Sequence, residues 1–406
     1  MEHVEALIVG GGQAGLAASR QLQRVGVEHV VLERGRIGQT WRDRWDSFCL
    51  VTPNWTVQLP DQPYDGDEPD GFMPRDEIVA YLERYRAAFA LPVREGVAAE
   101  SVESGAGGFI VRTTTGDLEA RSLVLATGAY QRPHRPPGAE TLPSHLLAID
   151  VDDYRNATAL PAGRILVVGS GQSGCQIAEE LRDEGREVVL SCGKAAWVPR
   201  RLGGVDIFRW LIDIGFMEAP VESLPNPMAR LAPNPTATGH GGGHDLDLRV
   251  LRAMGVTLAG HFLGASNHEV RFASDLAESI AWGDERNREF MDRIRVAAAA
   301  LGYPVPDIRE PEPFDATAPE SVSLEGFGAV VFAGGFRPSY RAWLPWPEAF
   351  DEMGFPINKD GASTIVEGLF FVGVHFLRKR KSSIFFGVGE DAAIVARAIG
   401  DIGSSR

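Results

Sequence analysis

Gly10-Gly11-Gly12-Gln13-Ala14-Gly15 and Gly169-Ser170-Gly171-Gln172-Ser173-Gly174 are two copies of one pattern, Gly-x-Gly-x-x-Gly. Each copy follows a short apolar run, residues 6–9 or 165–168, and precedes a helical pattern. In this strand-turn-helix context the first glycine makes a tight turn, the second lets backbone N–H groups approach a pyrophosphate, and the third lets helix and strand pack closely. The sequence therefore predicts two Rossmann-like units, each binding a dinucleotide.

The residues that follow each copy distinguish the two nucleotides. Glu33 ends the strand pattern after the first copy, where a carboxylate accepts hydrogen bonds from ribose hydroxyls and repels a 2′-phosphate, as for FAD or NAD. The strand pattern after the second copy ends in Ser191 and Lys194 with no such carboxylate, and Arg200 and Arg201 follow. A hydroxyl and cations suit a 2′-phosphate, which predicts NADPH. The alternative is that these cations are solvated surface charges.

Composition narrows the class of protein. The 406 residues predict about two to three domains, and 44% apolar with 23% charged residues are typical of a globular protein. The net charge of −15 argues against a nucleic-acid partner, and residues 378–381 are the only basic run. No apolar stretch approaches the ~20 residues that span a bilayer, and a strand pattern begins within the first few residues, so we expect a cytoplasmic protein without a membrane partner. The sequence leaves open whether the protein forms a homodimer.

Cysteine and histidine patterns favour no metal site. Cys49, Cys175 and Cys192 are too few and too scattered for a disulfide framework or a cysteine-based zinc site. The run 240–244, His-Gly-Gly-Gly-His, raises the alternatives of metal ligands or an esterase oxyanion loop. It has no helical spacing, and the chain has no Gly-x-Ser-x-Gly motif, so we expect a mobile loop near the substrate or NADPH. His375 either faces that site or is packed.

The order of motifs predicts an α/β fold in which the second Rossmann-like unit is inserted into the first. Residues 126–128, Ala-Thr-Gly, are echoed by residues 333–335, Ala-Gly-Gly, as expected where the chain crosses between two nucleotide domains. The predicted boundaries are 1–160 for the first part of the FAD domain, 161–324 for the NADPH domain with an irregular insertion at about 220–244, and 325–406 for the second part of the FAD domain. A helix is expected at 75–90 and another at 390–399, and an antiparallel meander between 97 and 118.

These motifs also carry a family resemblance. They are residues 10–15 with Glu33, the turn Gly38-x-x-Trp41-Arg42, residues 126–128, 169–174, 333–338, and Gly373 with 387–392. In order and spacing the chain resembles the single-component flavoprotein monooxygenases, which include flavin-containing monooxygenases, Baeyer–Villiger monooxygenases and plant indole-3-pyruvate monooxygenases.

The resemblance implies FAD, NADPH and a set of site residues. Asn54 would be the catalytic polar group beside the flavin; its alternative is an ordinary Pro-Asn turn. A helix that begins near Glu390 would direct its N–H groups at the pyrimidine end of the flavin. The residues expected to bind the two cofactors are Gly10, Gly12, Gln13, Ala14, Gly15, Glu33, Arg34, Trp41, Arg42, Leu50, Thr52, Ala126, Thr127, Gly128, Gly169, Ser170, Gly171, Gln172, Ser173, Gly174, Ser191, Lys194, Arg200 and Gly373.

The activity that the resemblance implies is oxygen transfer. NADPH would reduce FAD, and a C4a-(hydro)peroxyflavin formed with O₂ would pass one oxygen atom to a small organic substrate at N or S. Baeyer–Villiger oxygenation of a ketone is an alternative, but the family's hinge motif Phe-x-Gly-x-x-x-His is replaced by Ser144, Leu146 and Asp150, which weakens it. Further alternatives are an NADPH oxidase or reductase that uses Cys49, and a flavin-bound redox sensor without turnover.

Overall fold

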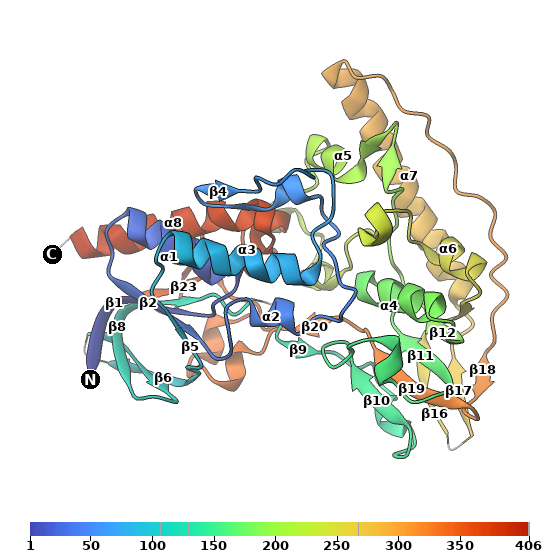
Figure 1. Cartoon of the computed structure of the whole chain (residues 1–406), viewed down its shortest axis with the longest axis horizontal. Coiled ribbons are helices and arrows are strands. Elements are labelled where there is room, and N and C mark those ends of the chain that lie inside the picture. Colours follow the sequence, from blue (N-terminus) through green and yellow to red (C-terminus); the bar gives the residue numbers. More distant parts are fainter. Residues whose placement is uncertain (106, 129, 267, 405–406) are drawn as a thin grey trace.

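Two sheets organise the chain, and they lie in two lobes side by side (Figure 1). The computed structural model describes residues 1–105, 107–128, 130–266 and 268–404. Within these ranges, no helix is both long and apolar enough to cross a membrane.

The first lobe is built on a nine-stranded sheet around β1 (Glu2–Val9). The strand β1 pairs in parallel with β2 and β8, and its residues Ala6, Leu7 and Ile8 are fully buried, because layers cover both faces of this part of the sheet. The other strands of this sheet are β2 (His29–Glu33), β5 (Val93–Glu95), β6 (Ala99–Gly105), β7 (Gly108–Thr113), β8 (Leu118–Leu125), β21 (Asn358–Lys359), β22 (Ala362–Ser363) and β23 (Leu369–Phe371). The predicted meander is confirmed, since β6, β7 and β8 pair in antiparallel order.

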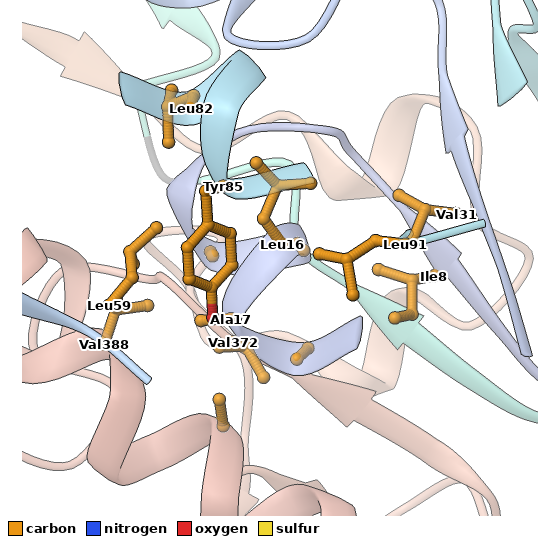
Figure 2. Packing of buried hydrophobic residues seen from close by; sticks show 14 of the residues in the cluster. Ile8, Leu16, Ala17, Val31, Leu59, Leu82, Tyr85, Leu91, Val372 and Val388 are labelled. Atoms are coloured by element: carbon orange, nitrogen blue, oxygen red, sulfur yellow. The ribbon is translucent and has the colours of Figure 1, made fainter. Parts of the chain in front are cut away.

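Three helices cover one face of this sheet: α1 (Gln13–Arg24), α3 (Arg75–Ala88) and α8 (Phe385–Ser404). Figure 2 shows how Leu16 of α1, Leu82 and Tyr85 of α3 and Val388 of α8 meet in one core. The helix α8 comes from the far end of the sequence, so the C-terminal segment completes the first lobe.

The second lobe is built on a five-stranded parallel sheet in the order β10-β19-β11-β12-β15. Its strands are β10 (Leu147–Asp150), β11 (Arg164–Val168), β12 (Val188–Ser191), β15 (Thr257–Ala259) and β19 (Phe327–Phe332). The helix α4 (Gln172–Asp183) follows β11, as α1 follows β1, and both lobes are therefore Rossmann-like. The lobe also contains α5 (Ile207–Asp213), α6 (Leu248–Ala253), the long α7 (Leu276–Leu301), and a small sheet of β16 (Phe262–Ala265), β17 (Glu269–Phe272) and β18 (Ser321–Ser323).

The chain crosses between the lobes twice, and the two crossings lie together. The short strand β9 (Arg132–Pro133) pairs antiparallel with β20 (Phe336–Arg337). The sequence echo between 126–128 and 333–335 precedes these two strands. The remaining short elements are α2 (Gln39–Arg42), β3 (Gln58–Leu59), β4 (Gln62–Pro63), β13 (Arg201–Leu202) and β14 (Val205–Asp206), together with single 3₁₀ turns.

Two expectations about boundaries need correction. Strands β10 and β19 fall in the segments 1–160 and 325–406 assigned to the FAD domain, yet both pair in the second sheet. We therefore propose that the domain boundaries lie at the paired crossings β9 and β20. The last helix begins at Phe385, not near Glu390, because residues 380–383 form a 3₁₀ turn that leads directly into it.

Candidate active site

The two glycine motifs have the same local geometry. A Cβ on Gly15 would lie 1.8 Å from the carbonyl oxygen of Gly10, and a Cβ on Gly174 would lie 1.8 Å from that of Gly169. In both motifs, therefore, the third glycine is required by helix-on-strand packing. Gly10 and Gly169 have positive φ angles of 115° and 112°, a backbone conformation that L side chains rarely adopt.

The middle glycines leave space free at the start of each helix. No atom of the described chain lies within 4 Å of a Cβ built on Gly12, and only the Pro233 side chain, at 3.7 Å, approaches one on Gly171. These residues are the N-caps of α1 and α4, and neither helix has a side-chain cap hydrogen bond. Open space and free N–H groups at a helix N-terminus are what a pyrophosphate requires.

Glu33 is held at the first motif by the backbone. Its carboxylate accepts hydrogen bonds from the N–H groups of Gly11 and Gly35, both at 2.8 Å. A carboxylate has about four acceptor positions, so it can still accept ribose hydroxyls. Gly373 adds close packing here, because its Cβ would lie 2.3 Å from that of Ala14. Arg34, the next residue along, is exposed.

The second motif opens into a cavity of about 770 Å³. Its wall includes the motif residues 168–173, Lys194 and His261 from the second lobe. Thr52, His375 and Ser383 from the first lobe line the same space. The cavity therefore lies between the two lobes, where a ligand of one nucleotide unit can reach a ligand of the other.

Of the residues expected to bind the 2′-phosphate, Lys194 remains a candidate, whereas Ser191 and Arg200 form hydrogen bonds within the protein. Lys194 is exposed and lines the cavity. The Ser191 hydroxyl is buried and donates to the Gly260 carbonyl at 2.9 Å, and Ser191 also lines the cavity. Arg200 is 1% exposed and forms a bidentate ion pair with Asp206, while its Nη1 donates to the Val51 carbonyl at 2.7 Å. Since Val51 belongs to the first lobe, Arg200 instead connects the lobes.

The other residues of the second motif organise the loop that covers it. Ser170 is buried, and its hydroxyl exchanges hydrogen bonds with the backbone of Gly193. Gln172 is bonded to Ala237 through both ends of its amide, at 2.6 and 3.2 Å. Ser173 lines the cavity.

Around the first motif, Gln13 forms a chain of contacts. Its Oε1 accepts the Trp41 indole N–H at 3.0 Å, and its Nε2 donates to the Ser383 carbonyl at 3.1 Å. Trp41 also stacks on Phe385 at 5.6 Å between ring centroids. Arg42 points elsewhere, because it bonds the Ile37 carbonyl and pairs with Glu83 of α3.

The segment expected to lie against the flavin is only partly open. Thr52 lines the cavity, and its hydroxyl accepts from Thr56 at 3.0 Å. Leu50 is instead a core residue, 5% exposed, whose N–H donates to Met73. Asn54 is 4% exposed; its Nδ2 donates to the Glu68 carbonyl at 3.0 Å, but its buried Oδ1 has no hydrogen-bond partner in the described chain.

The turn after β8 is tied to the crossings. Ala126 packs under Gly10, whose Cβ would lie 2.6 Å from the Ala126 carbonyl oxygen. Thr127 accepts from Gln131, and the Gly128 carbonyl accepts the Tyr340 hydroxyl at 2.8 Å. The equivalent contact occurs at the second motif, where a Cβ on Gly169 would lie 2.6 Å from the Ala333 carbonyl oxygen.

The glycine loop at 240–244 is packed between the lobes. Gly239 and Gly243 lie against Phe72, where a Cβ would approach to 2.6 and 2.5 Å. His244 bonds Glu179 of α4 through its Nε2. Within the parts of the chain that the structure describes, no group of three or more His, Cys, Asp or Glu residues is arranged to hold a metal ion.

Cys49 is not arranged as a redox nucleophile. It is 7% exposed and is absent from the wall of the cavity as described. Burial raises the pKa of its thiol to about 11, so it is protonated at neutral pH. Cys175 and Cys192 are likewise buried free thiols whose pKa is raised by burial.

Comparisons with known proteins agree with this geometry. A family model described as pyridine nucleotide-disulphide oxidoreductase matches residues 7–202. An uncharacterized CzcO-like oxidoreductase of Geobacillus kaustophilus is 31% identical over 395 residues, with 97% of each chain covered. The indole-3-pyruvate monooxygenase YUCCA1 of Oryza sativa is 33% identical over 221 residues, which are 51% of this chain and 54% of that protein.

The chain belongs to the family of the CzcO-like oxidoreductases. A solved flavin-containing monooxygenase from Stenotrophomonas maltophilia has the same fold, with a TM-score of 0.71 at 19% identity, covering 99% of this chain and 100% of that one. The chain is accordingly an oxidoreductase, and FAD and NADPH are the cofactors of the flavin monooxygenases and pyridine nucleotide-disulphide oxidoreductases that it resembles.

The sequence motifs of the family did not indicate the cationic side of the cavity. Arg230, Arg337 and Arg380 line it, and burial lowers the pKa of all three guanidinium groups. His375 is 8% exposed and lies on the same wall; burial and then Arg380 and Arg230 lower its pKa to about 4. The basic run 378–381 was the one available signal, but nothing in it distinguishes an inward residue from an outward one.

Proposed function

We propose that this chain is an NADPH- and O₂-dependent monooxygenase that transfers one oxygen atom to N or S of a small organic substrate. The observation that carries the proposal is the cavity between the lobes, which joins the second glycine motif to Thr52, His375 and Ser383 of the first lobe. Residues of both lobes thus line one space, and of the two glycine motifs the second is on its wall.

FAD fits the first unit. The bare space at Gly12 suits its pyrophosphate, Glu33 its ribose hydroxyls, and the Gln13–Trp41 pair would flank it. Bound there, FAD would supply the redox chemistry of the reaction, taking electrons from NADPH and activating O₂. Asn54 stays a candidate for the polar group beside it, because an unsatisfied buried amide oxygen calls for a donor.

NADPH fits the second unit. The space at Gly171 suits its pyrophosphate, and the exposed Lys194, which lines the cavity, would suit its 2′-phosphate. The chain's own contribution is to orient the nucleotide and to exclude water: Phe208, Leu211 and Met217 make part of the wall apolar.

Oxygenation at N or S is favoured over ketone oxygenation by the hinge. The Asp150 side chain, which stands where Baeyer–Villiger enzymes have a histidine, is paired with Arg135 at 2.7 and 3.0 Å. A carboxylate held in an ion pair does not supply a switchable cation at this hinge.

An oxidase or reductase that works through Cys49 is disfavoured, because the thiol is buried, protonated and away from the cavity wall. The proposal is tested by supplying NADPH and ¹⁸O₂ with a panel of amines and thioethers. We expect an N- or S-oxide that carries one ¹⁸O atom. Conversion of all consumed O₂ to H₂O₂ with every member of the panel, abolished by Cys49→Ser, would support the oxidase instead.

A further inference from the structure

The basic run at 378–381 is not uniform. Arg378 pairs with Asp360, Glu390 and Asp391, at 3.1, 3.2 and 2.8 Å. Lys379 and Lys381 both pair with Glu218 and Glu390. Three of the four cations are therefore neutralised by carboxylates outside the cavity.

Arg380 is the exception. Among the residues that the structure describes, no carboxylate lies within ion-pair distance of it. Its guanidinium lies over the rings of Phe216 and Phe376, with the Cζ atom 3.9 and 4.6 Å from their centroids. Its Nη1 donates to Asn234 at 2.8 Å, whereas its buried Nε has no hydrogen-bond partner in the described chain.

The neighbours of Arg380 add positive charge. Arg230 lines the same cavity, and its contact with Asp351 is long, at 3.4 Å. Burial and the nearby Arg293 lower the pKa of Arg380 to about 10, so it stays charged at neutral pH. Arg380 is half-buried, and a cation partly removed from water without a counter-ion is costly; an anionic ligand relieves that cost.

We propose that Arg380, with Arg230, binds an anionic group of the substrate, a carboxylate or sulfonate, while the apolar part of that substrate lies against Phe208, Leu211 and Met217. This proposal rests on the proposed function, because it takes the cavity to hold the substrate that receives the oxygen atom. The geometry supports it because two aromatic rings contact the guanidinium, whose Nε–H has no partner in the described chain and can donate to an oxyanion. The apolar residues line the same cavity.

A phosphate of NADPH is the other anion that this cavity could present to Arg380. The two sources are distinguished by competition. A substrate anion binds when NADP⁺ already saturates the protein, whereas a ligand that occupies a cofactor phosphate site is displaced by NADP⁺.

The test is calorimetric titration of the FAD-loaded protein with phenylacetate and with the neutral, similarly shaped phenylacetamide, each with and without saturating NADP⁺. We expect phenylacetate to bind at least about tenfold more tightly than the amide, and to do so in both conditions. Arg380→Gln should remove that preference and leave binding of the amide unchanged. Lys379→Gln is the matched control, because it removes the same charge outside the cavity while Lys381 still pairs with Glu218 and Glu390.

Equal affinities for acid and amide in the native protein, or no binding of either, would overturn the proposal, and this comparison requires no variant to fold. Loss of phenylacetate binding under NADP⁺, together with weaker NADP⁺ binding by Arg380→Gln, would overturn it in favour of a cofactor phosphate site. Because these titrations involve no turnover, their outcome is independent of whether the ¹⁸O experiment detects oxygen transfer.

Discussion

At the scale of single residues, ionisable side chains around the cavity differ in how far their charge is compensated. Arg200 is buried but has Asp206 as a bidentate partner, so its charge stabilises the contact between lobes. His375 is buried beside two arginines and is neutral. Lys194 is exposed. These three environments lead to three different expected responses to substitution.

His375 should make stability depend on pH. Its pKa is about 4 in the folded protein against 6.5 for the free side chain, so between these values the unfolded chain binds more protons. The stability that depends on neutral His375 is fully present above about pH 6.5 and is lost as the pH falls toward 4. In His375→Gln, the difference in unfolding free energy between pH 7 and pH 4.5 should shrink by on the order of 2 kcal/mol. Urea unfolding at both pH values measures it; an unchanged difference would contradict the account.

Asp206→Asn should destabilise the protein through Arg200. The substitution leaves a buried guanidinium without its counter-ion, which costs about 3–5 kcal/mol. Asp292→Asn is the control, because the Asp292–Arg295 pair is exposed and should change the unfolding free energy by less than about 1 kcal/mol. Equal changes of the unfolding free energy in the two variants, measured by denaturant unfolding, would show that the buried Arg200–Asp206 pair is no more important for stability than the exposed pair.

Lys194→Glu should change nucleotide selectivity. The new carboxylate would repel a 2′-phosphate, so the KM for NADPH should rise about tenfold or more while that for NADH changes little. Steady-state kinetics with both nucleotides decides this point. A parallel rise in both KM values would remove Lys194 from the phosphate site.

At the scale of elements, each nucleotide unit depends on a strand, a glycine turn and a helix. The sequence predicted these units correctly because the function of each glycine is local: the turn at Gly10, the space at Gly12 and the packing at Gly15 are set within one motif. The start of α8 was predicted wrongly, and β10 and β19 were assigned to the FAD segments although both pair in the second sheet, because these features depend on contacts between distant segments. Partners of Ser191, Arg42 and Arg200 were missed for the same reason.

Two alanine substitutions in the first motif should separate binding from folding. Gly15→Ala places a methyl group against the Gly10 carbonyl and should destabilise the whole first lobe. Gly12→Ala meets no atom of the described chain within 4 Å, and its φ of −86° suits alanine, so the protein should fold but lose FAD. Circular dichroism and the flavin-to-protein ratio measure the two effects. Full flavin content in Gly12→Ala would place the pyrophosphate elsewhere.

At the scale of the whole molecule, one cavity is lined by residues of both lobes, which is the arrangement that the proposed transfer of electrons between two cofactors requires. The order of the motifs along the sequence is enough to predict the fold and the two cofactors. The cationic wall at Arg380 could not be predicted in this way, because Glu218 and Glu390 neutralise the neighbouring lysines only in the folded chain.

The reaction of the reduced protein with O₂ tests the proposed oxygen transfer most directly. The FAD-loaded protein is reduced anaerobically with NADPH and mixed with O₂ in a stopped-flow spectrometer. We expect a delay before oxidised flavin returns, with a transient absorbance that matches neither the oxidised nor the reduced form, because the cavity shields the reacting centre from water. Immediate single-phase return of oxidised flavin, with one H₂O₂ formed per NADPH, would contradict a monooxygenase.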